Sequence, residues 1–283
     1  MIVWISSYPK SGNTWVRGFI ASLLYTNNGE NNFSKLEKIK QFPTRKLFKN
    51  FVDNFQNINE VSKNWVNVQN FINLDNKIKF LKTHHTNCSI GKFNFTDDEN
   101  TIGVIHIVRD PRNVITSIKN HFSLENINDA KNFILNDKNW AGIVRDNKDK
   151  DKDYKVPTLI SSWKINYLSW KNRTQNYMLV KYEDLIKNPN KEFLKISNYI
   201  SKIMNIKFSE NKILNAIKTS SFENMKNLEE KGLFNESVST KNDEKVKFFN
   251  LGPKNDWKIY LNNEIIEEIN LKFKNEMEEL GYL

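Results

Sequence analysis

The stretch IVWISSYPKSGNTW, residues 2–15, decides the fold of this chain. Its apolar start (Ile2–Ile5) is typical of a buried strand, and Pro9 holds the residue before it extended and so ends the strand. The apolar residues after the turn recur at helical spacing, which predicts a helix that begins near Asn13 or Thr14. The stretch therefore predicts a strand, a turn of small residues and a helix in direct succession.

The turn between this strand and this helix is a predicted anion site. Free backbone N–H groups and the positive end of the helix dipole converge at a helix N-terminus, and Lys10 adds a full positive charge. The P-loop of nucleotide triphosphatases has a glycine separated by four residues from its Gly-Lys-Ser/Thr end, and this turn lacks that glycine. We expect a phosphate or a phosphate-like group here. The alternative is an ordinary turn with a solvated Lys10.

Three further apolar runs predict strands of the same sheet, namely Lys77–Leu81, Val104–Val108 and Tyr177–Val180. Polar residues follow each run, at the edge of an open α/β sheet where ligands bind. Helical periodicity follows the prolines at 111 and 189. Alternating strands and helices predict an α/β fold with a mostly parallel central sheet flanked by helices.

The bulk properties set the outer limits of the interpretation. The 283 residues show no composition break, so we expect a single domain over residues 1–283. The net charge of +10 admits nucleic acid, an acidic membrane surface or an anionic small ligand, but the lysines are scattered as on a solvated surface. Cys88 is the only cysteine, which excludes an intrachain disulfide and a thiolate metal cluster. Met1 leads directly into the first strand and no segment has the length of a membrane span, so we expect a cytoplasmic protein with no membrane partner.

Four segments have a less regular pattern. Residues 33–76 are predicted to be helical in part, and the charged run 145–153 to be an exposed loop. The polar segment 228–247 is a candidate flap over a pocket. An apolar stripe over residues 265–280 predicts one amphipathic helix that packs on the core.

Arg109 and Ser117 are candidate ligands of a second phosphate. Arg109 comes directly after a predicted strand, and Ser117 lies eight residues later on the predicted helix. A guanidinium holds a phosphate through two parallel hydrogen bonds, and a serine hydroxyl adds a third. The alternative from the residues alone is a surface arrangement of Arg109 with Asp110 and a solvated Ser117.

Two of these segments carry a resemblance to a known family. YPKSGNTW (residues 8–15) closely resembles the 5′-phosphosulfate loop, a P-loop-like loop, of the sulfotransferases that use 3′-phosphoadenosine 5′-phosphosulfate (PAPS). The usual form has Thr in place of Asn13, which keeps a polar residue able to cap the helix. VRDPRNVITS (residues 108–117) looks like the family's 3′-phosphate motif. The resemblance implies that PAPS is the cofactor and adenosine 3′,5′-bisphosphate (PAP) the product, that Arg109 and Ser117 bind the 3′-phosphate, and that the loop binds the nucleotide through Lys10, Ser11, Gly12, Asn13, Thr14 and Trp15.

The segment Lys82-Thr83-His84 is similar to the family's catalytic strand end. The resemblance implies that His84 is the general base, a task that suits histidine because imidazole titrates near neutrality. Lys82 would neutralise charge on the sulfuryl group, and Lys10 would stabilise the phosphate leaving group. His85 is the alternative base, since neighbouring side chains on a strand point to opposite faces. A structural role for His84 is the other alternative.

The family also supplies aromatic rings and a small hydroxyl residue around the adenine. Adenine is recognised largely through its flat face, so an apolar slot suits it. The matching positions here are Trp15, Tyr182 and Phe222, with Ser220 at the hydroxyl position. Each of these aromatic residues on its own is equally consistent with a core position.

The chain departs from the family near the C-terminus. The family reads Arg-Lys-Gly or Arg-Arg-Gly, then a short spacer and Gly-Asp-Trp, whereas this chain reads FFNLGPKNDW over residues 248–257. Gly252 keeps its place as a nucleotide-binding residue, but Asn250 and Leu251 replace the basic pair. We therefore predict weaker nucleotide affinity than in an enzyme with the basic pair, with a lysine at 245, 247 or 254 as the possible substitute.

The sequence thus predicts a sulfotransferase that moves a sulfuryl group from PAPS to a hydroxyl, or to an amine, of a small-molecule or glycan acceptor. We expect no metal, because no histidine pair or carboxylate cluster lies near the loops. The alternatives are a P-loop-type kinase or NTPase and a basic nucleic-acid-binding protein without catalysis. The pattern identifies neither the acceptor nor the oligomeric state.

Overall fold

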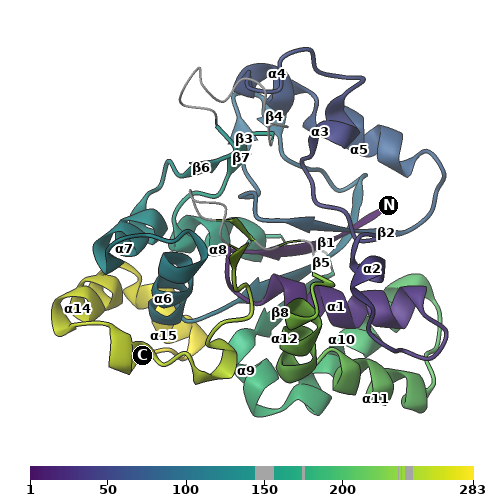
Figure 1. Ribbon diagram of the computed structural model, residues 1–283. Helices are drawn as coiled ribbons and strands as arrows, with labels where there is room; N and C mark the ends of the chain where they lie inside the picture. The colour runs from purple at the N-terminus through teal and green to yellow at the C-terminus, as the bar shows by residue number, and fades with distance from the viewer. Residues whose placement is uncertain (144–155, 174–175, 235, 237, 240–244) are drawn as a thin grey trace. The chain divides into compact units, whose positions relative to one another are not determined.

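The computed structural model describes residues 1–283 except 144–155, 174–175, 235, 237 and 240–244. A four-stranded central sheet has the strand order β2-β1-β5-β8 (Figure 1). β1 and β2 pair in parallel, with Ser6 opposite Thr83. The predicted α/β fold with a parallel central sheet flanked by helices is confirmed. The strands are β1 (Ile2–Ser7), β2 (Lys79–Thr83), β5 (Thr101–Val108) and β8 (Tyr177–Lys181).

The first strand is buried along its whole length, as its apolar sequence predicts. Trp4 lies among the rings of Phe42, Phe95 and Trp170, with centroid distances of 5.4, 5.4 and 6.1 Å. Its indole Nε1 donates a hydrogen bond to Thr101 Oγ1 at 2.9 Å, so the polar atom of this buried ring is satisfied. Burying a large apolar side chain contributes about 2 kcal/mol, and this aromatic cluster anchors the sheet.

The chain forms two compact units. Unit 1 comprises Met1–Tyr8, Ile39–His106 and Asn136–Leu179. It contains β1, β2, most of β5 and of β8, and two small antiparallel strand pairs, β3 with β4 and β6 with β7. The remaining elements of unit 1 are α3 (Arg45–Phe48), α4 (Ile58–Lys63), α5 (Trp65–Asn73), β3 (Ser89–Ile90), β4 (Phe93–Asn94), β6 (Trp140–Ala141), β7 (Thr158–Leu159) and α8 (Trp163–Lys171).

Unit 2 comprises Pro9–Lys38, Ile107–Leu135 and Val180–Leu283. It is mostly helical, and α1 contacts α2, α10 and α11 within it. Its helices are α1 (Asn13–Tyr25), α2 (Phe33–Leu36), α6 (Pro111–His121), α7 (Ile127–Leu135), α9 (Tyr182–Lys187), α10 (Pro189–Met204), α11 (Glu210–Thr219), α12 (Phe222–Glu230), α13 (Trp257–Tyr260), α14 (Asn263–Lys272) and α15 (Lys274–Leu280), with a 3₁₀ turn at Gly252–Lys254 and the hairpin β9 (Val238–Ser239) and β10 (Lys245–Val246). A single domain over residues 1–283 stays a prediction.

The structure differs from the predicted elements in two places. β2 extends to Thr83, so Lys82 lies within the strand and not beyond its end. The single C-terminal helix is wrong, because Phe273 leaves helical geometry (φ −116°, ψ 21°) and separates α14 from α15. The ring of Phe273 is buried, which favours this bend over a straight helix. The predicted loop 145–153 lies outside the described residues, and so does part of the candidate flap 228–247.

Two further observations concern the helices of the described residues and the single cysteine. Among the helices of the described ranges, none combines the length and the hydropathy that crossing a membrane requires. The single cysteine, Cys88, is a free thiol in unit 1, and partial burial raises its pKa to about 11. A thiol with such a pKa is protonated at neutral pH, so it is a weak nucleophile.

Candidate functional site

The predicted anion loop contains two residues in the left-handed backbone region. Lys10 has φ 66° and Gly12 has φ 101°. A Cβ on Gly12 would lie 2.6 Å from Cδ2 of Tyr182, closer than side chains pack. Only glycine combines this φ with this contact, so the residue type at position 12 is set by the loop conformation.

The N-terminus of α1 has the donors that an anion needs. α1 begins at Asn13 as predicted, but Gly12 is the N-cap, and no side chain caps the helix. The capping role open to Asn13 is therefore not used. The first turn has no acidic residue, and Ser11 is completely buried, with an Oγ that has no hydrogen-bond partner among the described residues. An uncapped helix end beside an unsatisfied buried hydroxyl fits an anionic group.

Arg109 and Ser117 come together as predicted. Arg109 directly follows β5, Pro111 opens α6, and Ser117 lies further along that helix. Arg109 Nη1 donates to Ser117 Oγ at 3.0 Å and to the carbonyl oxygen of Lys10 at 3.0 Å. One guanidinium nitrogen therefore joins the predicted 3′-phosphate motif to the predicted 5′-phosphosulfate loop within unit 2.

Asn255 completes this arrangement, and the sequence analysis missed it. Its Nδ2 donates to Ser117 Oγ at 3.1 Å and to the carbonyl oxygen of Asn113 at 2.9 Å. Its Oδ1 accepts from Thr116 Oγ1 at 2.7 Å. Asn255 is buried, at 7% exposure. The available signal was its place in Asn255-Asp256-Trp257, where the family pattern has glycine.

The predicted aromatic residues form two separate groups within unit 2. Trp15 and Tyr182 are in edge contact at 5.8 Å, and the Arg109 guanidinium lies 4.2 Å from the Tyr182 ring centroid. Tyr182 is buried under the loop, where it contacts Gly12. This position makes Tyr182 a support of the loop.

The second aromatic group contains Phe222. A Cβ on Gly252 would lie 2.2 Å from the Phe222 ring, so the backbone at Gly252 (φ 53°) packs directly against that ring. Phe222 is half-buried, and its ring centroid is 5.9 Å from that of Phe249. Ser220 is completely buried, and its Oγ donates to the carbonyl oxygen of Ala216 at 2.7 Å at the end of α11.

Phe248 contacts the loop lysine, which the sequence analysis did not predict. The Lys10 ammonium lies 3.7 Å from the centroid of the Phe248 ring. The backbone N–H groups of Phe248 and Phe249 both donate to the carboxylate of Glu229 on α12, at 2.6 and 2.9 Å. An aromatic face attracts a cation, so this ring holds Lys10 close to the segment in which the basic pair is replaced. Of the lysines considered as substitutes, Lys247 and Lys254 are exposed.

His84 lies in unit 1, directly after β2. Its Nδ1 is 2.8 Å from the carbonyl oxygen of Ser7 and 3.2 Å from Ser7 Oγ. A carbonyl oxygen only accepts, so Nδ1 carries the proton, and Nε2 is the basic nitrogen of the neutral ring. Asn166 Nδ2 donates to the His84 carbonyl oxygen at 3.1 Å and fixes the backbone. Lys82 is half-buried in β2, opposite Ile5 of β1.

His85 lies in a different environment from His84. Its ring stacks on Phe95 at 4.3 Å with an interplanar angle of 6°, and its Nδ1 donates to the carbonyl oxygen of Thr86 at 2.6 Å. Burial lowers the pKa of His85 to about 4. A completely buried ring with this pKa is a poor proton acceptor at neutral pH, which disfavours the alternative base.

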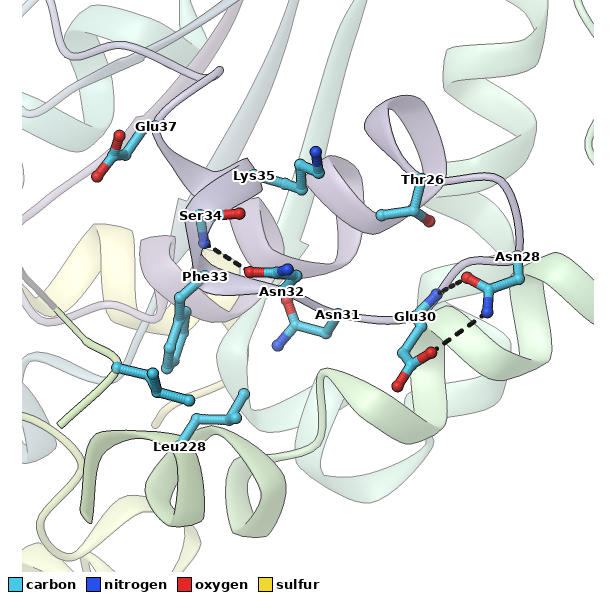
Figure 2. A pocket seen from close by; sticks show the side chains of 11 residues that line it. Thr26, Asn28, Glu30, Asn31, Asn32, Phe33, Ser34, Lys35, Glu37 and Leu228 are labelled. Carbon is cyan, nitrogen blue, oxygen red and sulfur yellow. Dashed lines mark hydrogen bonds between the residues drawn. The ribbon is translucent and has the colours of Figure 1, made fainter. Parts of the chain in front are cut away.

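Metal ligands and surface clefts are the other kinds of site to consider in the described residues. Within those ranges, no three or more His, Cys, Asp or Glu side chains group as metal ligands. A cleft of about 610 Å³ lies on unit 2, between the 26–37 segment and the end of α12, and Figure 2 shows Asn28 hydrogen-bonded to Glu30 at its rim. None of the predicted site residues lines this cleft. Its lining consists of Thr26, Asn28, Glu30, Asn31, Asn32, Phe33, Ser34, Lys35, Glu37, Leu228 and Leu233.

Two solved structures share the fold of this chain. Mouse sulfotransferase SULT7A1 complexed with PAP has a TM-score of 0.56 at 17% identity, over 98% of this chain and 84% of that protein. Retinol dehydratase in a complex with retinol and PAP has a TM-score of 0.59 at 15% identity, over 98% of this chain and 81% of that protein. At these identities the likeness concerns the fold.

Curated relatives are similar in sequence at low identity. The luciferin sulfotransferase of Photinus pyralis is 24% identical over 234 residues, which are 79% of this chain and 56% of that relative. The amine sulfotransferase of Oryctolagus cuniculus is 24% identical over 288 residues, which cover 98% of this chain and 81% of that protein. The sulfotransferase domain family matches residues 2–281, nearly the whole sequence. The chain therefore belongs to the sulfotransferase family.

Proposed function

We propose that this protein transfers a sulfuryl group from PAPS to a hydroxyl, or to an amine, of a small-molecule acceptor. The observation that carries the proposal is the position of Arg109. Its Nη1 binds the Lys10 carbonyl oxygen and Ser117 Oγ at 3.0 Å each, so the two predicted phosphate-binding segments meet at one cation. A nucleotide with phosphates on both ends of its ribose needs two such segments at a fixed separation.

The residues of unit 2 fit the two anionic ends of this nucleotide. At the 5′ end, the uncapped N-terminus of α1, the buried Ser11 hydroxyl and the Lys10 ammonium supply donors and positive charge. At the 3′ end, Arg109 and Ser117 supply a guanidinium and a hydroxyl. Because these groups place donors and positive charge at both anionic ends, we propose that transfer needs no metal ion.

The base of the nucleotide needs a flat apolar neighbour. We propose that Phe222 offers its half-buried ring to the adenine, with Trp15 as the second aromatic residue. Tyr182 acts from beneath, since it is buried against Gly12 and Arg109. Ser220 holds the end of α11 and so sets the position at which α12 and Phe222 begin.

We propose that His84 is the general base. When PAPS is bound, its phosphosulfate supplies a sulfuryl group that leaves a phosphate oxygen as the acceptor atom attacks the sulfur. The His84 Nε2 then takes the acceptor's proton, because Nδ1 is committed as a donor to Ser7. Ser7 directly precedes the loop of residues 8–15 along the chain, which supports a role in the same reaction. Lys82 neutralises charge on the sulfuryl group, and Lys10 stabilises the leaving phosphate.

A small organic acceptor is better supported than a glycan. One solved structure of retinol dehydratase holds retinol together with PAP, and a second structure of that protein holds androsterone with PAP. The curated relatives are named for luciferin and for an amine. The match to the sulfotransferase domain also favours sulfuryl transfer over a kinase or NTPase reaction. The cytoplasmic location stays a prediction from the sequence.

Calorimetric titration with PAP, followed by an acceptor screen with labelled PAPS, tests this function. We expect saturable one-site binding of PAP, and transfer to at least one hydroxyl or amine acceptor. His84→Ala should bind PAP like the parent but lose at least about a hundredfold in kcat, the typical contribution of a positioned base. His85→Gln is the matched control and should retain kcat. Equal kcat values for His84→Ala and the parent would remove His84 from the chemistry.

A further inference from the structure

Ser117 receives two hydrogen bonds and, within the described residues, donates none. Arg109 Nη1 lies 3.0 Å from its Oγ, and Asn255 Nδ2 lies 3.1 Å from it. A guanidinium nitrogen and an amide nitrogen are donors only, and a hydroxyl oxygen has two lone pairs. Both lone pairs of the Ser117 hydroxyl are therefore occupied, and only its proton remains to interact with a further group.

The orientation of Asn255 is set by its other contacts. Its Nδ2 lies 2.9 Å from the Asn113 carbonyl oxygen, which accepts and never donates, so the NH₂ group and not the oxygen faces Asn113. Its Oδ1 accepts from Thr116 Oγ1 at 2.7 Å. The two hydrogens of the NH₂ group are thus assigned, one to Asn113 and the other to Ser117. The opposite orientation of the amide would set two acceptors against each other.

A further bond holds the segment that carries Asn255. The backbone N–H of Trp257 donates to Asn113 Oδ1 at 2.9 Å, so Asn113 binds this segment through both its carbonyl and its side chain. Asn255 is buried, and Ser117 is half-buried. Solvent therefore has little access to the Asn255 amide, whereas the half-buried Ser117 side chain is accessible to a ligand.

We infer that Asn255 is a positioning residue that makes the Ser117 hydroxyl a dedicated hydrogen-bond donor to the 3′-phosphate of the nucleotide. The inference rests on the proposed function, which assigns Ser117 to that phosphate. An ionised phosphate oxygen accepts hydrogen bonds. A hydroxyl whose two lone pairs already accept hydrogen bonds presents its proton to such an oxygen without reorganisation. Two N–H donors also polarise the hydroxyl and strengthen the bond it makes.

A departure of this chain from the family pattern supports the inference. Asn255 stands where the family pattern has glycine, and Asn250 and Leu251 stand where it has a basic pair. Glycine has no side chain with which to orient a serine. The chain thus lacks two cations near the 3′ end, and instead has a neutral amide that fixes the direction of one hydroxyl proton.

Calorimetric binding of PAP and of adenosine 5′-monophosphate (AMP) tests the inference, because AMP lacks the 3′-phosphate. Asn255→Ala should bind PAP about tenfold more weakly, the effect of one buried hydrogen bond to a charged partner. Asn255→Asp should lose about a hundredfold, because the carboxylate accepts the Ser117 proton and adds negative charge. Both variants should bind AMP like the parent. Asn255→Asp has the size of the native side chain and keeps the test valid if the alanine variant does not fold.

Two controls separate this role from packing. Asn31→Ala removes a buried, hydrogen-bonded asparagine of unit 2 that bonds the Thr219 carbonyl oxygen and Met225, and it should leave the ratio of PAP to AMP affinity unchanged. In a Ser117→Ala background, Asn255→Ala should cause no further loss of PAP affinity.

Several results would overturn the inference. Parallel losses for PAP and AMP would show a general packing effect, and unchanged PAP affinity in both Asn255 variants would show that Ser117 needs no orientation. Additive losses in the Ser117→Ala background would show that Asn255 acts independently of the hydroxyl. If the parent protein bound no PAP, the proposed function would fail together with the inference. If the parent bound PAP and one of the results above were observed, the inference alone would fail.

Discussion

Lys10 adopts a left-handed backbone, with φ 66°, that costs a non-glycine residue about 1 kcal/mol. Two contacts offset this cost. The Arg109 guanidinium donates to the Lys10 carbonyl oxygen, and the Phe248 ring lies 3.7 Å from the Lys10 ammonium. Phe248 is in turn fixed by the Glu229 carboxylate. The residue that would face the leaving phosphate is thus held through both its backbone and its side chain.

The contact between Lys10 and Phe248 predicts an energetic coupling. Lys10→Met and Phe248→Leu each keep an apolar side chain of similar size but remove the cation or the aromatic face. In a double-mutant cycle, measured by urea unfolding, we expect a coupling free energy of about 0.5–1 kcal/mol, typical of a partly exposed cation–π pair. Phe249→Leu is the control, since its ring belongs to the same cluster as Phe248. Strict additivity of Lys10→Met and Phe248→Leu would contradict the prediction.

Residues with local partners were predictable, and residues with distant partners were not. Arg109 and Ser117 are eight residues apart, and a strand end followed by a proline-initiated helix already places them together. Asn255 lies 138 residues from Ser117 and 139 from Thr116, and Phe248 lies still farther along the chain from its partner Lys10. No periodicity encodes such pairs, so only the folded chain identifies them.

At the scale of elements, the loop between β1 and α1 imposes the strictest requirement. Gly12 combines φ 101° with a Cβ position 2.6 Å from the buried Tyr182 ring. Tyr182 begins α9 directly after β8, so the ring cannot move away without shifting an element that leaves the sheet. A side chain at position 12 therefore distorts the loop, and the backbone N–H groups at the start of α1 lose their common direction.

Gly12→Ala tests this requirement. We expect it to destabilise the fold by about 1–3 kcal/mol, the cost of a strained backbone residue, and to weaken PAP binding by at least about a hundredfold because the anion loop no longer closes. Urea unfolding and calorimetry measure the two effects. Gly232→Ala is the control, since Gly232 also has a positive φ (75°) but open space at its Cβ. It should lose some stability and no PAP affinity, whereas a Gly12→Ala protein with parental PAP affinity would refute the account.

Element boundaries show why local patterns are limited. The central strands and the helices after Pro111 and Pro189 follow from apolar runs and proline placement. The C-terminal stripe has a helical period throughout, yet the buried ring of Phe273 divides it into α14 and α15. Tertiary packing decides such a bend, and the hydrophobic period alone does not contain it.

At the scale of the molecule, two buried histidines couple the stability of unit 1 to pH. Burial lowers the pKa of His85 from 6.5 to about 4 and that of His106 from 6.5 to about 3. The unfolded chain therefore binds more protons than the folded chain below about pH 6.5. Stability from these groups is fully present above that pH, and it is lost as the pH falls toward the folded-state pKa values.

This coupling predicts acid destabilisation. Between pH 7 and 5 each histidine should lower the free energy of unfolding by about 2 kcal/mol. Urea unfolding of the parent and of the His85→Gln/His106→Gln protein at both pH values measures the effect. The double variant is less stable at pH 7, because it loses buried contacts, but its stability should change much less with pH. An equal change in the two proteins would contradict the assignment.

The single thiol of the chain has a practical consequence. With a pKa of about 11, only about one Cys88 side chain in ten thousand is ionised at pH 7. A maleimide dye would thus react selectively with a cysteine introduced at an exposed position such as Lys231, beyond the end of α12. A Lys231→Cys protein could therefore be labelled for fluorescence measurements of ligand binding without first replacing Cys88.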